Sequence, residues 1–432
     1  MPLSTRDRPS ATPDVSSPPP TLRRSRAVWP RIAILVGVFV GVLYNLAGFP
    51  AFGRPWGSVY HLDLDVYRLA GHAFLSGADV YQGLPATQLG VPLPFVYPPF
   101  AAVLFGPGAE MSLAHLGLAM TVLSMVALAA SLLITLRSLG LGPAGRLGWA
   151  TGAAVVASFV LEPVFATLEF GQVNLILLAL VAADCLMRRT PWPRGLLIGI
   201  AAAVKLTPIV FVLYLLLRRD VRAALVAVAG FAACTALGFL LAFHDSVEFW
   251  RGMLDGDQRM QVTAYVGNQS IGAVLLRLGL PGNGMLWLLT AAVVGALTML
   301  GMRRALRGGR TALAFGINGV GGLLVSPVAW SHHWVYAVPL LLALGYEAWR
   351  TRSRLLALTL VLGLVMFHFA PHFRIGYWRQ DGIGYSLTDQ LAMDSYVWWG
   401  LALLVVAVSY RARHRHALPA TTSTSTGALT SA

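Results

Sequence analysis

The chain has 432 residues, of which 56% are hydrophobic and only 12% are charged, and its mean hydropathy is +0.67. The core of a soluble protein of this length cannot bury so much apolar surface, so the composition excludes an ordinary soluble protein and indicates a membrane protein. The net charge of +14 does not indicate nucleic-acid binding, because the basic residues punctuate apolar segments instead of following one polar face.

The two ends of the chain are too polar to bury a core. Residues 1–28 are rich in Ser, Pro and Arg, and residues 413–432 are rich in Thr and Ser, so both are predicted to be disordered cytoplasmic tails. Several Arg residues precede the first apolar segment and no convincing cleavage site follows it, which predicts a retained helix and no removed signal peptide. Residues 29–412 are expected to form a single integral membrane domain.

The apolar segments predict an all-α, polytopic membrane protein with about ten to twelve transmembrane helices, each of roughly 20 apolar residues. Spans are expected near residues 31–49, 111–137, 147–168, 172–187, 222–243, 284–302, 311–329, 334–349, 354–370 and 395–410. The apolar segment 195–217 could cross the membrane once or form a re-entrant hairpin that breaks at Lys205. The hairpin is favoured, because it places most basic residues on the side of the two termini, which is then cytoplasmic.

On that topology most carboxylates lie in the extracytoplasmic loops, where function is sought. The long loops are residues 50–110, 244–283 and 371–394. In the first loop, the pattern HLDLDVYRLAGH predicts a short amphipathic helix with Asp63 and Tyr67 on one face. Such a carboxylate could act as a general base, or its helix could be an interfacial one whose charges only face water. The pattern alone does not rank Asp63 above Asp65.

Three further segments carry polar groups beside apolar ones. Pro98 and Pro99 precede an apolar run that is too short to span, which indicates a re-entrant half-helix or simply sets the entry angle of the next helix. The amides of Gln172 and Asn174 could bind sugar hydroxyls, although turn formation explains this segment equally well. Lys205 needs a partner in its apolar surroundings, either a lipid phosphate or an outer carboxylate.

The densest group of polar and aromatic residues is SPVAWSHHWVYAVP, which contains His332 and His333. Adjacent helical residues point about 100° apart, so one histidine facing a cavity is favoured over a metal site. Trp330 could stack on a sugar or belong to the aromatic belt of the membrane interface. In the last outer loop, Arg374 could bind a phosphate or contact lipid headgroups.

The order and spacing of these motifs carry a resemblance to a known family. The segments DLDVYRLAG, FVYPPFAAVLFGP, GQVN, AAAVKLTPIVF, NQSIGAVLLRL and SPVAWSHHWVYAVP resemble those of actinobacterial polyprenyl-phosphate-mannose-dependent mannosyltransferases, glycosyltransferase family 87. The similarity covers about residues 30–412. It implies a GT-C membrane fold, a polyprenyl-phosphate-mannose donor, and α-1,2 transfer to a glycolipid acceptor such as a phosphatidylinositol mannoside or lipomannan.

The resemblance also implies roles for individual residues. Asp63 matches the aspartate that would activate the acceptor hydroxyl, and Asp65 is the second choice. Lys205, His332 and His333 match the family's lysine and paired histidines and are expected to bind the donor phosphate. From the residue patterns themselves, Arg68, Gln172 and Asn174 are added as residues that bind the donor phosphate or sugar, with Tyr67, Trp330 and Arg374 as secondary candidates. Ala329 stands where many relatives have Ser, which leaves the subfamily open. Because no nucleotide-binding glycine loop and no clear metal-ligand cluster occur, no cofactor is expected, while a requirement for a divalent cation stays open.

Three alternatives remain at this point. The chain could transfer another lipid-linked sugar such as arabinofuranose or glucose, because no loop reveals the stereochemistry of the sugar. It could be a transporter or flippase of lipid-linked sugars, although the polar residues gather on one face and do not line a route across the bilayer. It could also be an inactive scaffold for cell-envelope assembly, in which case Asp63 would be dispensable. The expected partners besides donor and acceptor are membrane lipids, and nucleic acid is not among them.

Overall fold

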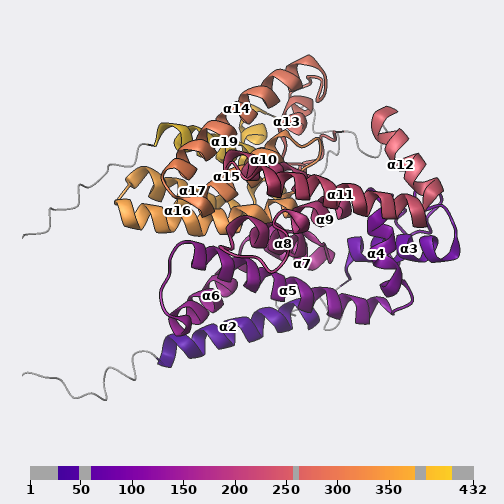
Figure 1. Ribbon diagram of the computed structural model, residues 1–432, viewed down its shortest axis with the longest axis horizontal. Coiled ribbons are helices and arrows are strands. Elements are labelled where there is room, and N and C mark those ends of the chain that lie inside the picture. Colours follow the sequence, from indigo (N-terminus) through magenta and orange to yellow (C-terminus); the bar gives the residue numbers. More distant parts are fainter. Residues whose placement is uncertain (1–27, 48–59, 256–261, 375–385, 411–432) are drawn as a thin grey trace, which may run out of the picture. The chain divides into compact units, whose positions relative to one another are not determined.

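The computed structural model describes residues 28–47, 60–255, 262–374 and 386–410 (Figure 1). Within these ranges every regular element is a helix, and the only β-type pairing is an isolated bridge between Asn268 and Trp330. The predicted all-α class is therefore confirmed. The predicted tails, apart from Val28, and parts of the three long loops lie outside the described residues.

The chain divides into two compact units. The first is formed by Met1–Ile209, Val226–Met260 and Ser331–Val335, and the second by Val210–Leu225, Gln261–Trp330 and Tyr336–Ala432. Helix α11 (Val221–Leu241) contributes residues to both units, as do the short 3₁₀ helices η2 (Thr207–Val210) and η4 (Ser331–Tyr336).

The first unit holds the elements that carry most of the predicted site. Its remaining helices are α2 (Val28–Ala47), α3 (Leu62–Ser76), α4 (Pro99–Ala109), α5 (Leu113–Ser138), α6 (Ala144–Ser158), α7 (Glu162–Phe170), α8 (Asn174–Leu186), α9 (Leu196–Val204) and α12 (Phe243–Asp255). Helix α3 packs against α4 at Gly71, where a Cβ atom would lie 2.9 Å from the backbone of Phe105. Helix α5 packs against α6 and α8, and α8 packs against α9.

The second unit is built around α15 (Thr311–Val325), in which every residue from Ala312 to Leu324 is buried. Its other helices are α10 (Phe211–Leu217), α13 (Ile271–Arg277), α14 (Met285–Arg307), α16 (Ala337–Thr351), α17 (Arg354–Phe369), η5 (Pro371–Phe373), α18 (Leu387–Met393) and α19 (Ser395–Ser409). Helices α14, α16 and α19 pack directly against α15. The helix is apolar apart from Thr311 and Asn318, and it is surrounded because it has no polar face to turn toward water.

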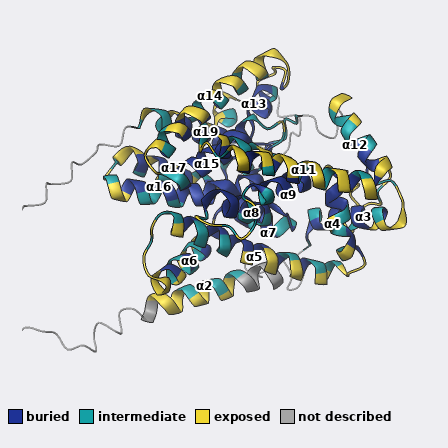
Figure 2. Ribbon diagram, in the orientation of Figure 1, coloured by how far each residue is buried: buried dark blue, intermediate teal, exposed yellow. Residues whose placement is uncertain are grey.

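The helices confirm a multi-pass membrane protein. In the described residues four helical segments are long and apolar enough to cross a membrane: Leu113–Ser138, Val221–Leu241, Met285–Arg307 and Arg354–Phe373. Two bent helix pairs, α6 with α7 and α18 with α19, raise the number to six if each pair is one span. Large apolar side chains are exposed along α11 and α14 (Figure 2), including Leu240 at 78% and Met285 at 71%, as expected for surfaces that face lipid.

The structure corrects one predicted span and refines another segment. Residues 147–168 do not form one straight helix, because α6 and α7 meet at an angle of 79°. Pro163 lies in the first turn of α7, and because it has no backbone N–H it interrupts the helical hydrogen bonding at the bend. The apolar segment 195–217 breaks at Lys205, as the sequence predicts: α9 ends there, and Lys205 is extended, with φ −150° and ψ 125°.

Candidate active site

Helix α3 presents Asp63 and Tyr67 one helical turn apart, as predicted. Asp63 lies in the first turn, where the amide groups of the helix terminus favour a carboxylate. Its side chain is only partly buried, and its Oδ2 accepts a 2.6 Å hydrogen bond from Gln172 Nε2. Its Oδ1 has no hydrogen-bond partner among the described residues. Asp63 therefore keeps one oxygen available to a ligand.

Asp65 has the opposite surroundings and is completely buried. Its Oδ1 accepts hydrogen bonds from Arg68 Nε and Nη2, at 3.2 and 3.1 Å. Its Oδ2 accepts from the Tyr60 hydroxyl at 2.7 Å and from the Gln88 backbone amide at 2.9 Å. Both oxygens are thus occupied, and the carboxylate ties α3 to the chain on either side of it. The ion pair with Asp65 holds the Arg68 guanidinium in place. A contact of Arg68 with the donor stays a prediction.

A tight turn between α7 and α8 brings Gln172 to α3. Gly171 ends α7 with φ +68°, a left-handed conformation that residues with a Cβ atom rarely adopt. An added Cβ would also lie 2.7 Å from Leu64 Cβ and 2.9 Å from His61 Cβ, so the turn sits directly on the start of α3. His61 is held there by a 2.9 Å hydrogen bond between its Nδ1 and the Glu169 carbonyl.

Two tyrosines complete the surroundings of Gln172. Its Oε1 accepts hydrogen bonds from the Tyr67 hydroxyl at 2.7 Å and from the Tyr97 hydroxyl at 2.9 Å. The two hydroxyls also lie 2.7 Å apart. Tyr97 was not among the residues predicted from the sequence. Its position directly before Pro98 and the start of α4 was the available signal, because one interpretation of that segment was a re-entrant half-helix beside a polar site.

Lys205 lies where α9 ends, and its ammonium has three hydrogen-bond partners among the residues that the structure describes. Nζ is 2.9 Å from Asn174 Oδ1, 3.3 Å from the Tyr97 hydroxyl and 2.8 Å from His333 Nε2. An ammonium has three protons to donate, so these contacts satisfy it without a carboxylate in direct contact. Lys205 therefore joins the residues around Asp63 to the histidine segment through Tyr97.

The two histidines of η4 have different partners. The His332 backbone carbonyl accepts hydrogen bonds from Thr167 Oγ1 and Asn174 Nδ2, at 3.0 and 3.1 Å. His333 is turned toward Lys205, and the role of the pair in donor binding stays a prediction. Both rings are buried, yet His332 Nε2 and His333 Nδ1 have no hydrogen-bond partner within the part of the chain that the structure describes. Buried polar atoms are seldom left unpaired, so both nitrogens are available to a ligand.

The charges of this cluster follow from its burial. Burial raises the pKa of Asp63, while the hydrogen bond from Gln172 and the nearby Lys205 ammonium oppose that rise. Burial, and then the Lys205 charge, holds the pKa of His333 well below its ordinary value. In a neutral His333, Nε2 can accept a hydrogen bond from the Lys205 ammonium, and the proton of the ring is then on Nδ1. The arrangement combines a carboxylate with a free oxygen, a cation and a neutral N–H donor.

The structure places two predicted residues in the second unit. Trp330 has its ring 5.9 Å from that of Tyr265, and it forms the isolated bridge with Asn268. Arg374 donates to the Phe369 carbonyl at 2.8 Å. Their roles in sugar or phosphate binding stay predictions.

The second unit also contains a buried ion pair that sequence analysis did not single out. Arg277 of α13 pairs with Asp394, and it donates further hydrogen bonds to the backbone carbonyls of Ala264, Tyr265 and Asn268. It connects α13 to the chain before α19. The sequence feature that could have revealed this pair is the position of Arg277 and Asp394 at the ends of apolar segments, which the positive-inside tendency alone does not explain.

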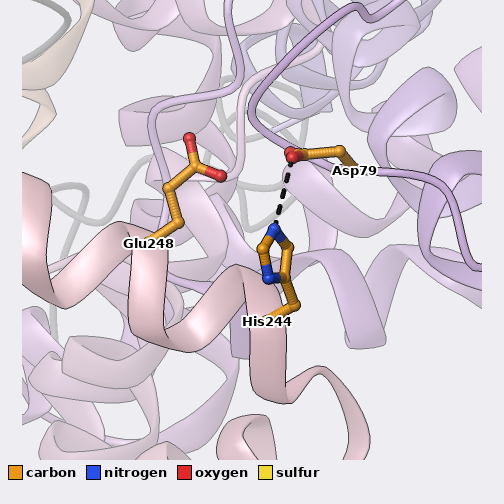
Figure 3. Close-up of side chains that lie close together, drawn as sticks. All are labelled: Asp79, His244 and Glu248. Carbon is orange, nitrogen blue, oxygen red and sulfur yellow. Dashed lines mark ion pairs between the residues drawn. The ribbon is translucent and has the colours of Figure 1, made fainter.

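A separate group of side chains could hold a divalent cation. Asp79, His244 and Glu248 have ligand atoms within 4.8 Å of one another (Figure 3). His244 and Glu248 are four residues apart on α12 and so share a face, while Asp79 follows α3. Asp79 Oδ2 lies 3.8 Å from His244 Nε2, and the His244 side chain is 83% exposed. Among the described residues, this surface group is the candidate for the cation requirement that the sequence left open.

A helical membrane protein that clusters a partly exposed carboxylate, an ammonium and two histidines has the parts of a membrane transferase. The comparisons with known proteins agree. The model of glycosyltransferase family 87 matches residues 95–327. Together with the relatives below, this match establishes that the chain belongs to glycosyltransferase family 87.

The relatives are mycobacterial enzymes. The chain is 41% identical over 396 residues to the polyprenol-phosphate-mannose-dependent alpha-(1-2)-phosphatidylinositol mannoside mannosyltransferase of Mycobacterium tuberculosis, covering 88% of this chain and 91% of that protein. The protein of the same name from Mycolicibacterium smegmatis is also 41% identical, over 84% and 88% of the two chains. A phosphatidylinositol pentamannoside mannosyltransferase of M. tuberculosis is 33% identical over 78% and 76%. No solved structure matches the chain.

Proposed function

We propose that this protein transfers mannose from a polyprenyl-phosphate-mannose donor to a phosphatidylinositol mannoside, forming an α-1,2 linkage with inversion at the anomeric carbon. The proposal is supported by membership of family 87 and by the donor and acceptor that the names of the two relatives at 41% identity state. The smaller similarity to the pentamannoside enzyme favours a phosphatidylinositol mannoside acceptor of the kind used by those first two relatives.

The single observation that carries the mechanism is the contrast within α3. Asp65 has both oxygens occupied, whereas Asp63 has one oxygen held by Gln172 and one to which no described residue bonds. A general base needs an oxygen within reach of the proton that it removes. Asp63 is therefore assigned as the base, and Asp65 as the residue that stabilises α3.

The reaction needs one displacement. Asp63 Oδ1 takes the proton of the acceptor hydroxyl as that oxygen attacks the anomeric carbon from the face opposite the phosphate. The new carbon–oxygen bond forms while the bond to the phosphate oxygen breaks, and the electron pair leaves with the polyprenyl phosphate. Attack on a β-linked donor gives the α product. The leaving phosphate gains negative charge, so cations and N–H donors placed beside it lower the barrier.

Lys205 and the paired histidines are assigned to that phosphate. Lys205 supplies a positive charge, and His333 Nδ1 supplies a buried N–H donor whose partner is not provided by the described residues. Tyr97 is the most distant of the three Lys205 partners, at 3.3 Å, so a phosphate oxygen can replace it at the smallest cost in hydrogen bonding. Asn174 holds Lys205 and the histidine segment in place, because its Oδ1 accepts a hydrogen bond from Lys205 Nζ and its Nδ2 donates one to the His332 carbonyl.

The proposed orientation places this site at the extracytoplasmic face of a cell membrane and both termini in the cytoplasm. It is supported by the distribution of basic residues, which cluster in the connections on the side of the termini. A donor and an acceptor that are both lipids reach such a site within the plane of the membrane.

The function is tested with purified protein in lipid nanodiscs, radiolabelled polyprenyl-phosphate-mannose and purified phosphatidylinositol mannosides. We expect label to move to the glycolipid, and we expect an exo-α-mannosidase specific for 1,2 linkages to release it. Movement of intact donor between leaflets of a vesicle without transfer would contradict the proposal and indicate a flippase. Transfer from a donor that carries another sugar, with none from the mannose donor, would overturn the sugar assignment.

A further inference from the structure

The Gln172 side chain is buried, and both ends of its amide are bound. Its Oε1 accepts hydrogen bonds from the hydroxyls of Tyr67 and Tyr97, and its Nε2 donates one to Asp63. The two tyrosines and Asp63 leave only the second Nε2 proton of the amide for any other partner. The contacts suit a group that orients another side chain better than a group that contacts the substrate directly.

The hydrogen bonds of the two tyrosines determine which end of the Gln172 amide faces them. The Tyr97 hydroxyl accepts a hydrogen bond from Lys205 Nζ, so its own proton is directed to Gln172 or to Tyr67. If the amide were reversed, its oxygen would face Asp63 Oδ2 at 2.6 Å with no proton between them unless Asp63 were protonated. The observed orientation therefore matches an ionised Asp63, and a chain of hydrogen bonds runs from Lys205 through Tyr97 and Gln172 to that carboxylate.

We propose that Gln172, oriented by Tyr67 and Tyr97, is the positioning residue of the catalytic base. It holds Oδ2 of Asp63, so that Oδ1 faces the acceptor hydroxyl. It also stabilises the ionised carboxylate, since a hydrogen bond donated to the charged form favours that form. This inference rests on the proposed role of Asp63 as the base.

The other ionisable groups around Asp63 are few. Lys205 comes from the end of α9 and lowers the carboxyl pKa, while Tyr67 of α3 and Tyr97 before α4 are neutral phenols at ordinary pH, because burial raises the pKa of both. His332 and His333 of η4 are kept neutral beside Lys205. A change at Gln172 that leaves these groups in place therefore reports on the Gln172 amide itself.

The test measures kcat, KM and the dependence of kcat/KM on pH for Gln172→Met, which keeps the length of the side chain and removes its hydrogen bonds. We expect kcat to fall by about 10- to 100-fold, which corresponds to the loss of one hydrogen bond to a charged group. We expect the donor KM to change by less than about threefold. The pH at which activity is lost on acidification should move upward, because the carboxylate loses a donor that stabilises it.

Two conservative variants keep the test decisive if Gln172→Met folds poorly. Tyr67→Phe and Tyr97→Phe each remove one donor to Oε1 and are expected to shift the acidic limb in the same direction by a smaller amount. Gln88→Met is the matched control, because the Gln88 side chain is exposed and the hydrogen bond that Gln88 donates to Asp65 comes from its backbone amide, which the substitution keeps. We expect that control to keep the wild-type kcat and pH profile.

A merely structural role predicts a lower melting temperature and less active protein with an unchanged acidic limb, and that result in all three variants would overturn the inference. The outcomes also separate this inference from the proposed function. If Asp63→Asn retains turnover, the base assignment fails and the positioning role fails with it. If Asp63→Asn is inactive while Gln172→Met keeps the wild-type profile, only the positioning role fails.

Discussion

Asp63 and Asp65 stand two residues apart in α3 and have opposite surroundings. Their sequence context, DLDVY, offers no physical reason to prefer one, and resemblance to family 87 was needed to rank them. The difference arises from residues remote in sequence, because Gln172 approaches Asp63 while Tyr60, Arg68 and the Gln88 amide enclose Asp65. Tyr97 escaped prediction for the same reason, since its partners come from three other segments.

The raised pKa of Asp63 gives the reaction a defined dependence on pH. A base must be ionised, so the contribution of Asp63 to activity should be complete above its pKa and should be lost as the pH drops through it. Burial raises that pKa above the ordinary aspartate value of about 3.9. We therefore expect the acidic limb of the kcat/KM profile to lie above this value, which rate measurements between pH 4 and 8 at constant ionic strength would show. An acidic limb at or below the ordinary value would argue against Asp63 as the base.

Removing the charge of Lys205 should weaken donor use. We expect Lys205→Met to lower kcat/KM for the donor by about 10- to 150-fold, because a hydrogen bond to a charged group contributes about 1.5–3 kcal/mol. The acidic limb should also move to higher pH, because the ammonium lowers the Asp63 pKa. Arg251→Met is the matched control, since Arg251 is an exposed cation on α12. Equal losses in both variants would indicate a general effect of charge, contrary to a specific role for Lys205.

At the scale of elements, the turn at Gly171 determines whether Gln172 reaches α3. Gly171→Ala adds both a strained left-handed residue and a collision with Leu64 and His61. Gly77→Ala adds the strain alone, because Gly77 has φ +70° with nothing within 4 Å of the added atom. We expect Gly77→Ala to cost about 1–3 kcal/mol of stability with normal turnover. Gly171→Ala should cost more and should also lower kcat, as thermal unfolding and transfer assays would reveal.

If Gly171→Ala and Gly77→Ala gave the same loss of stability and the same turnover, the close approach of the turn to α3 would have no part in positioning Gln172. The comparison is informative because both glycines end a helix in the same backbone conformation.

Element boundaries were predictable where hydrophobic length alone determines them. Helices α5, α11, α14 and α19 begin and end within a few residues of the expected spans, because apolar length and flanking Arg residues define them. The bend between α6 and α7 was missed, since the composition of 147–168 is apolar throughout and only Pro163 marks the break. The break at Lys205 was found because a charged residue followed by Pro208 interrupts an apolar run.

At the scale of the whole molecule, the distribution of charge predicts which loops face the outside. We expect Leu254→Cys, at an 87% exposed position on α12, to react with a membrane-impermeant maleimide in intact cells. Gly142→Cys, in the exposed connection between α5 and α6, should react only after the membrane is permeabilised. Both variants need the background Cys234→Ser, because Cys234 is a partly accessible free thiol. The reverse labelling pattern would invert the proposed orientation.

The central claim is that one carboxylate performs the proton transfer while other residues bind the donor, and Asp63→Asn in nanodiscs tests it most directly. The asparagine amide has nearly the shape of the carboxylate, but it is not basic enough to remove the proton from the acceptor hydroxyl. The account predicts that single-turnover transfer of labelled mannose falls by at least about 10³-fold, the scale of losing a general base, while the affinity for polyprenyl-phosphate-mannose stays within about threefold. Transfer at the wild-type rate by Asp63→Asn would contradict the account.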